Sequence, residues 1–121
     1  MRTLPALLWM VAIFAMSAQQ TVPQPPGFSI EYTAIAGHLV SYGILALLLL
    51  WALPAGAARP RYRLALAVLL AILYGASDEF HQSFVPGRSA TAFDVVVDAL
   101  GAILAVTLYA AWRARTPSRS R

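Results

Sequence analysis

The chain contains no cysteine, which excludes disulfide bonds, thiolate metal sites and a cysteine nucleophile. It also contains no lysine, so every basic residue is an arginine. Charged residues make up only 12% of the 121 residues, against 60% hydrophobic residues and a mean hydropathy of +0.67. An ordinary soluble domain has about 25% charged residues. The composition therefore predicts one compact helical unit that is solvated by lipid.

Four apolar segments are separated by short polar or proline-rich stretches. They predict an all-α polytopic membrane protein, a four-transmembrane-helix bundle with helices over residues 4–18, 33–53, 64–82 and 92–112. The second and fourth segments have roughly the 20 residues needed to cross a bilayer. Residues 1–112 would form the membrane domain, and residues 113–121 a basic, disordered cytoplasmic tail.

The third apolar run is too short to cross by itself. It ends at Ser77 after about 14 residues, roughly 21 Å of helix against a hydrocarbon thickness of about 30 Å. We therefore expect the helix to continue through residues 78–82, which places polar side chains at the depth of one leaflet. Pro86 and Gly87 then predict a turn, because proline presets its first corner and glycine accepts a positive φ at its second.

The first apolar segment has two interpretations. At about 15 residues it is short for a spanning helix, so it would have to tilt or cross a thin region. It also follows Arg2 and ends in the small residues 15–18, a pattern typical of a cleaved secretory signal peptide. The residues leave both alternatives open. The prolines and glycine at 23–27 predict a loop after it.

The arginines indicate orientation, because basic flanks accumulate on the cytoplasmic side of a membrane. In a four-helix arrangement all of them except Arg88 lie on one side of the membrane. We therefore expect both termini in the cytoplasm, and residues 78–88 on the outer face of a bacterial inner (cytoplasmic) membrane. This role accounts for the basic residues without a nucleic-acid partner.

Polar side chains occupy the outward half of three predicted helices, in stripes that follow helical spacing. They are His38 and Tyr42 on the second helix, Tyr74, Ser77, Asp78, His81 and Gln82 on the third, and Asp94, Asp98 and Gly101 on the fourth. Each ionisable group at this depth costs on the order of a few kcal/mol unless it is paired or hydrated. We therefore expect the stripes to face one another, with Gly101 at a close approach between helices.

Simpler roles remain open for several of these residues. Asp94 could cap the fourth helix together with Thr91. Arg88 could form a structural ion pair with Asp78 or Asp94. Glu79 lies about 100° from the main stripe of the third helix and could point to water. His38 could be a hydrogen-bonded packing residue.

The run SDEFHQ at residues 77–82, followed by FVPGR at 84–88 and by Asp94, Asp98 and Gly101, resembles the signature of the VanZ-like membrane proteins. His38 with Tyr42 resembles the second-helix motif of that family. The chain departs from the family pattern at Asp98, where asparagine is frequent, and at Ala105, where a second glycine is common. It also lacks a basic residue shortly before His38. The resemblance implies a four-helix bacterial membrane protein, in a family whose namesake is associated with resistance to the glycopeptide antibiotic teicoplanin.

These observations lead to a first functional hypothesis: the outward cluster binds an amphiphilic cell-envelope molecule, such as a lipid-linked or glycopeptide ligand, with a link to teicoplanin tolerance. Arg88 would contact an anionic head group. The predicted ligand-binding residues are His38, Tyr42, Gln82, Arg88 and Asp94. A catalytic version would also modify the ligand by acid–base chemistry. Its predicted residues are Asp78, Glu79 and Asp98, with His81 relaying protons.

Other classes of function differ in what the polar stripes do. In a non-catalytic accessory protein they only hold the helices together. Transport is disfavoured, because the cytoplasmic halves of the last three helices lack an acidic or histidine relay. No cofactor is expected. A zinc or manganese site made from His38, His81 and acidic residues is disfavoured, because these residues match no close-spaced ligand motif such as HExxH.

Overall fold

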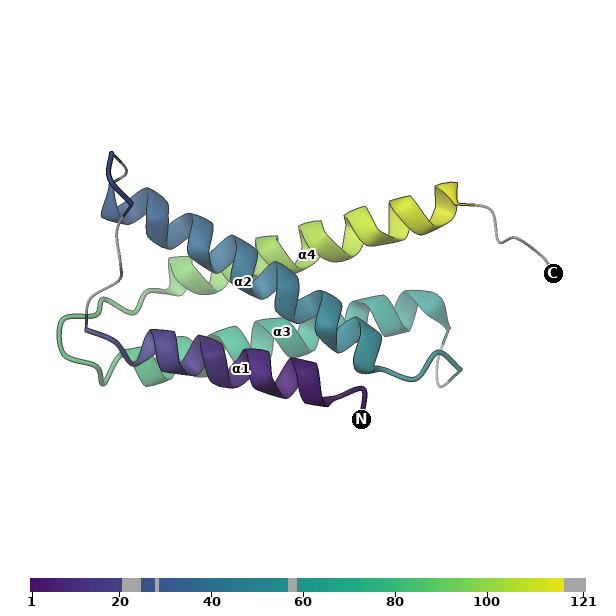
Figure 1. The fold of residues 1–121 in the computed structure, drawn as a ribbon, viewed down its shortest axis with the longest axis horizontal. Helices are drawn as coiled ribbons and strands as arrows, with labels where there is room; N and C mark the ends of the chain where they lie inside the picture. Colours follow the sequence, from purple (N-terminus) through teal and green to yellow (C-terminus); the bar gives the residue numbers. More distant parts are fainter. Residues whose placement is uncertain (21–24, 28, 57–58, 117–121) are drawn as a thin grey trace.

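The computed structural model describes residues 1–20, 25–27, 29–56 and 59–116, and these residues form four helices and no strand. Helix α1 spans Leu4–Ser17, α2 Ile30–Ala52, α3 Pro60–Gln82 and α4 Ala92–Arg115. All four run along one long axis (Figure 1). The α1–α2 and α3–α4 connections lie at one end, which we call the acidic end. The N-terminus, the α2–α3 connection and the last turn of α4 lie at the other, the arginine end. The predicted all-α fold is confirmed.

Three helices are long and apolar enough to cross a membrane, namely α2, α3 and α4. Helix α3 reaches this length because it continues through Gln82, as predicted. Helix α1 is apolar but has only 14 residues. Of the four predicted spans, the helix lengths thus support three directly.

Local chemistry moves some helix ends away from their predicted positions. Helix α2 begins three residues early because Ser29 caps it, the hydroxyl accepting a hydrogen bond from the Tyr32 backbone N–H at 3.3 Å. Helix α3 begins at Pro60, not at residue 64, because proline in a first turn sacrifices no helical hydrogen bond. Helix α4 continues to Arg115, so the predicted tail begins in helix. Residues 117–121 of that tail lie outside the described residues.

The α3–α4 connection has the predicted turn and cap. The Arg88 backbone N–H donates to the Val85 carbonyl at 3.2 Å, and Gly87 adopts a φ of +81°. At the start of α4, the Asp94 backbone N–H donates to the Thr91 hydroxyl at 3.3 Å, and that hydroxyl donates to the Asp94 carboxylate at 2.7 Å. These contacts fix the position from which Arg88 reaches back toward the bundle.

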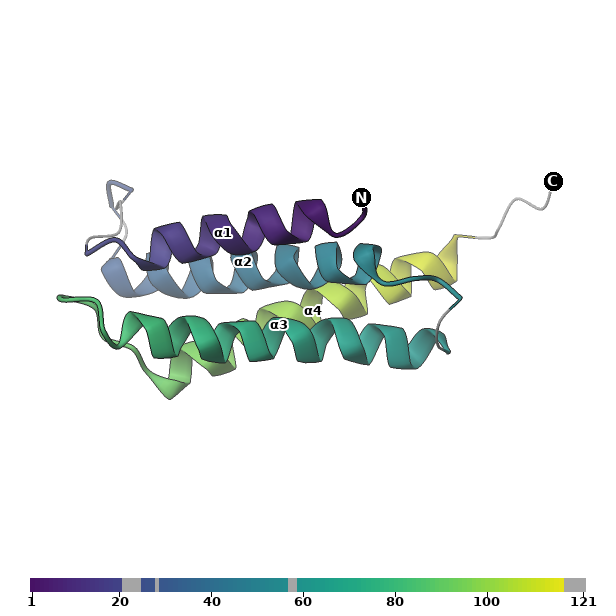
Figure 2. The same cartoon turned by 90° about the horizontal axis from the view of Figure 1, so that it is seen from below.

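The packing is built around α2. Helix α1 lies along α2 and α3, while α4 crosses α2 on the other side (Figures 1 and 2). The contact between α2 and α4 is the most extensive in the fold. It depends on Gly101, where an added Cβ would lie 2.9 Å from the Leu39 Cα. The predicted close approach at Gly101 is confirmed.

The surface of the bundle is apolar and part of its interior is polar. Large hydrophobic side chains are exposed on every helix, for example Leu8 (61% exposed), Leu73 (57%) and Leu108 (61%). The buried residues include Asp78, Glu79, Gln82 and Asp98. This inverted distribution fits lipid as the surrounding solvent.

At the arginine end, Arg63 completes the C-terminus of α2. Its guanidinium donates to the carbonyls of Leu50 at 2.6 Å and Leu53 at 3.1 Å. Carbonyls in the last turn of a helix have no partner within the helix. Arg63, which precedes the predicted helix start at residue 64, thus lies in the first turn of α3, and its side chain caps the C-terminus of α2.

Gly101→Ala should destabilise the fold, because the new methyl group would press on the Leu39 backbone, which cannot rotate away. We expect a loss of about 1–3 kcal/mol, measured as a lower melting temperature in detergent. Gly37→Ala is the matched control, since an added Cβ there meets nothing within 4 Å. It should leave stability unchanged or raise it by about 1 kcal/mol. Equal melting temperatures for the two variants would contradict the close packing.

Candidate functional site

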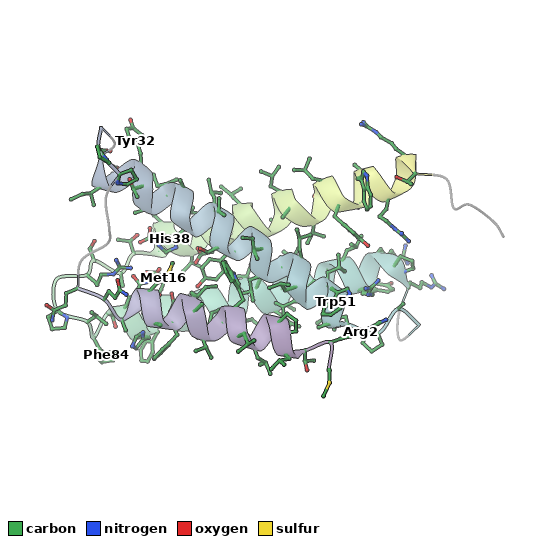
Figure 3. The ribbon with its side chains drawn as sticks, viewed as in Figure 1. Arg2, Met16, Tyr32, His38, Trp51 and Phe84 are labelled. Carbon is green, nitrogen blue, oxygen red and sulfur yellow. The ribbon has the colours of Figure 1, made fainter. Side chains whose placement is uncertain are left out.

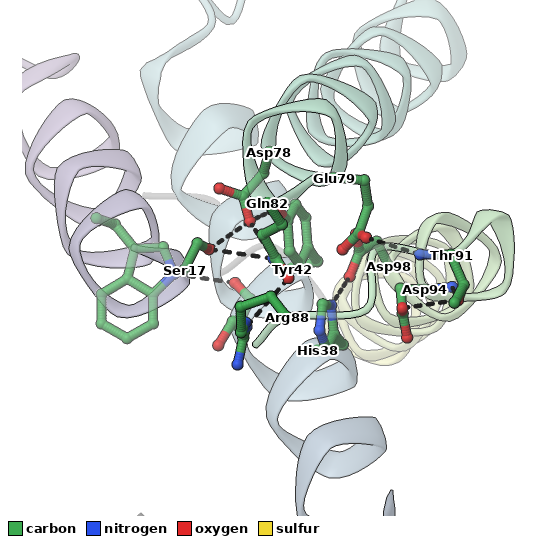
Figure 4. Close-up of polar contacts among 12 residues, drawn as sticks. Ser17, His38, Tyr42, Asp78, Glu79, Gln82, Arg88, Thr91, Asp94 and Asp98 are labelled. Atoms are coloured by element: carbon green, nitrogen blue, oxygen red, sulfur yellow. Dashed lines mark hydrogen bonds and ion pairs between the residues drawn. The ribbon is translucent and has the colours of Figure 1, made fainter. Parts of the chain in front are cut away.

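Polar side chains from all four helices meet in the interior of the acidic end (Figure 4). They form two adjoining groups. The first, which we call the cavity group, consists of Ser17, Tyr42, Asp78, Gln82 and Arg88. The second, the His38 triad, consists of His38, Glu79 and Asp98.

Asp78 is the centre of the cavity group. Its Oδ2 accepts hydrogen bonds from the Ser17 hydroxyl at 2.5 Å, the Gln82 amide at 3.1 Å and the Tyr42 hydroxyl at 3.4 Å. The side chain is buried. One carboxylate oxygen therefore ties α1 and α2 to α3.

Arg88 contacts the neutral side chain of Gln82. Its guanidinium donates to the Gln82 Oε1 at 3.1 Å, while the Gln82 Nε2 donates to Asp78 and to Ser17. Among the described residues Arg88 makes no ion pair, so the alternative pairing with Asp78 or Asp94 is not formed. Its charge is therefore not neutralised by a carboxylate there.

A cavity of about 270 Å³ opens beside the cavity group, between α1, α2 and α3. Its lining includes apolar residues, among them Ile13, Met16, Ala34 and Gly37. It also includes polar residues, namely Ser17, Gln19, Thr33, His38, Ser41, Tyr42, Asp78, Gln82 and Arg88. The cavity is thus amphipathic.

The His38 triad lies on the α4 side of the cavity. The His38 Nδ1 is 2.8 Å from the Asp98 Oδ1, and Asp98 is completely buried. The Glu79 Oε2 accepts a hydrogen bond from the Thr91 backbone N–H at 3.3 Å. The alternative that Glu79 points to water is wrong, because its side chain faces α4 and is 6% exposed. The polar stripe on α3 therefore divides, with Asp78 toward α1 and α2 and Glu79 toward α4.

Two of the predicted residues lie outside both groups. His81 stacks on the Phe14 ring of α1, with ring centroids 4.2 Å apart, and does not line the cavity. Asp94 caps α4 through Thr91. The structure brings together the remaining predicted residues: His38, Tyr42, Asp78, Gln82 and Arg88 along the cavity, and Glu79 and Asp98 behind His38.

Two residues that sequence reasoning did not select are essential to this geometry. Ser17 gives Asp78 its shortest hydrogen bond. Gly75 allows Asp98 to approach α3, since an added Cβ would lie 2.7 Å from the Asp98 Oδ2 and 3.2 Å from the Tyr42 ring. Gly75 stands one turn before Glu79, on the same face of α3, and that spacing was the only available signal.

The sequence model of one protein family, described as VanZ/LLP1, matches residues 3–113. The match includes α1, α2, α3 and nearly all of α4. No curated protein and no solved structure is significantly similar to the chain. The family match covers all the residues of both polar groups.

Ser17→Ala should destabilise the bundle by about 1–3 kcal/mol, because it removes a donor from the buried Asp78 carboxylate. The matched control is Ser77→Ala, since the Ser77 side chain is exposed and, among the residues that the structure describes, its hydroxyl bonds only the Tyr74 carbonyl of its own helix. That variant should stay within about 0.5 kcal/mol of wild type. Thermal unfolding in detergent measures both. If Ser17→Ala melts like Ser77→Ala, the Ser17–Asp78 contact does not hold α1 in place.

Proposed function

The chain belongs to the VanZ/LLP1 family, and on that premise we propose that it binds an amphiphilic molecule of the bacterial cell envelope at its acidic end. In this proposal the protein crosses the inner membrane four times with both termini in the cytoplasm. The observation on which the binding proposal rests is the amphipathic cavity, about 270 Å³ in volume, with Arg88 among its lining residues.

The distribution of the arginines supports the orientation. Figure 3 shows Arg2 and Trp51 toward the arginine end, and Met16, Tyr32, His38 and Phe84 toward the acidic end. The other arginines that the structure describes at the arginine end are Arg59, Arg61, Arg63, Arg113 and Arg115. By the positive-inside rule, this distribution favours a cytoplasmic location for the arginine end. The cavity then opens in the outer half of the membrane.

Contacts of α1 support its role as a fourth span. The Trp9 indole N–H donates to the Ser41 carbonyl at 2.9 Å, and the Tyr74 hydroxyl donates to the Met10 carbonyl at 2.6 Å. Together with Ser17 on Asp78, these hydrogen bonds connect α1 to both of its neighbours along its length. The short helix is thereby one wall of the cavity.

The chemistry of the cavity suggests the class of ligand. A guanidinium has five N–H donors in a planar fork that matches phosphate and carboxylate groups. Within the described part of the chain, the Arg88 side chain makes one hydrogen bond, to Gln82. The cavity volume, about 270 Å³, lies just below the range of about 300–1,000 Å³ that is usual for ligand pockets. It suits a head group with the first part of its chain. A lipid-linked envelope molecule or a glycopeptide would present such an anionic group to Arg88. Binding of a glycopeptide would connect the protein to teicoplanin tolerance.

Binding has stronger support than catalysis. Of the four predicted acid–base residues, only Asp78 lines the cavity. A modifying activity would therefore use Asp78 toward the ligand, with His38, which also lines the cavity and is hydrogen-bonded to Asp98, as a proton relay. The accessory-protein alternative is favoured by a different observation, the three hydrogen bonds that already satisfy one Asp78 oxygen.

The absence of native cysteine permits a clean topology test. Ser83→Cys places a thiol at the exposed acidic end, and Thr116→Cys places one at the exposed arginine end. We expect a membrane-impermeant maleimide to label the S83C protein in intact spheroplasts, and to label the T116C protein only after lysis. The reverse pattern would contradict the proposed orientation.

Arg88→Ala should lose a co-purifying anionic amphiphile. Native mass spectrometry of the detergent-purified protein should detect an adduct on wild type that is about 10- to 100-fold weaker on the variant, as expected for a charged hydrogen bond of about 1.5–3 kcal/mol. Arg61→Ala, at the opposite end, is the control and should retain the adduct. An equal adduct on both variants would contradict ligand binding at Arg88. Degradation of Arg88→Ala alone would favour the structural role.

A further inference from the structure

Three side chains from three helices converge beside the cavity with the composition of a metal site. His38 on α2, Glu79 on α3 and Asp98 on α4 point toward one another (Figure 4). Each offers one ligand atom, and the three atoms lie within 4.8 Å of one another. One imidazole nitrogen and two carboxylate oxygens form a set that suits zinc and manganese.

The carboxylates of this triad have oxygens without partners. The Glu79 Oε1 and the Asp98 Oδ2 are buried and accept no hydrogen bond from the described residues. The two side chains are 6% and 0% exposed, so bulk water does not reach them. A buried carboxylate oxygen is expected to have a partner. A single cation bound between the two side chains would be a partner for both oxygens.

The charges around the triad also favour a cation. Among the described residues, the one ion pair of the triad joins His38 to Asp98, and no basic side chain pairs with Glu79. The other charged side chains nearby are the acidic Asp78 and Asp94, and Arg88, which is bonded to Gln82. A bound dication would balance Glu79 and Asp98 and leave His38 as a neutral ligand.

We propose that His38, Glu79 and Asp98 bind one divalent transition-metal cation, zinc or manganese. Three protein ligands leave further coordination positions open, as in catalytic zinc sites. No close-spaced motif exists, because His38 and Asp98 are 60 residues apart and meet only across the α2–α4 contact. His38 also lines the cavity, so the metal site adjoins the site proposed for the envelope ligand, but its three ligands do not include Arg88.

Metal binding can be measured directly on the full chain in detergent. The affinity tag is removed first, since polyhistidine binds the same metals, and the protein is treated with a chelator. After dialysis against micromolar zinc or manganese, elemental analysis should find one equivalent per wild-type chain. Glu79→Gln and His38→Gln should bind at least about 100-fold more weakly. A competition between the two metals identifies which one the site prefers.

The controls use the same substitutions elsewhere. Glu31→Gln and His81→Gln change residues outside the triad and should retain the metal. Arg88→Ala should also retain it while losing the amphiphile, so the two proposals can fail separately. If the triad variants do not fold, the wild type still decides: its melting temperature should fall on chelation and recover with the preferred metal. Binding of neither metal by wild type, or equal loss in Glu31→Gln, would overturn the proposal.

Discussion

Hydrocarbon cannot hydrate a carboxylate, so every acidic side chain within the spans must find its partners on another helix. The architecture of the acidic end follows from this constraint. Asp78 is bonded to α1 and α2, Asp98 to α2, and Glu79 to the backbone at the start of α4. These contacts each give one carboxylate oxygen a partner, and they also determine how the helices pack. Stability and the arrangement of the site are therefore inseparable in this bundle.

Small residues allow the helices to approach closely enough for these side-chain contacts to form. Without a hydrophobic driving force between helices in lipid, close backbone approach is a main source of association. Gly101 allows α4 to touch the Leu39 backbone, and Gly75 gives Asp98 and Tyr42 space against α3. The tightest packing thus lies at the depth of the polar groups, where misplacement would expose a charge.

The sequence predicted the helical fold, the extension of α3 through Gln82, the turn at Gly87 and the Thr91–Asp94 cap, because all of these depend on local chemistry. It also identified most residues of the site, since polar side chains are rare in such a chain. It could not predict which stripe faces which helix. Glu79 faces α4 and His81 faces α1 because of how α3 is rotated in the bundle, and rotation is a tertiary property. In the sequence, Ser17 is one of a run of small residues at 15–18. Its role becomes visible only in the fold, where it donates a hydrogen bond to Asp78, 61 residues away.

The amide of Gln82 has a consequence for the electrostatics of the cavity. An amide neither gains nor loses a proton under ordinary conditions, yet it accepts from Arg88 with one atom and donates to Asp78 with the other. The Gln82 amide thus lies between the Arg88 guanidinium and the Asp78 carboxylate and keeps them from forming a salt bridge. Arg88 and Asp78 therefore lie close together without forming an ion pair. The cavity can thus offer one cationic and one anionic side chain to the same polar ligand.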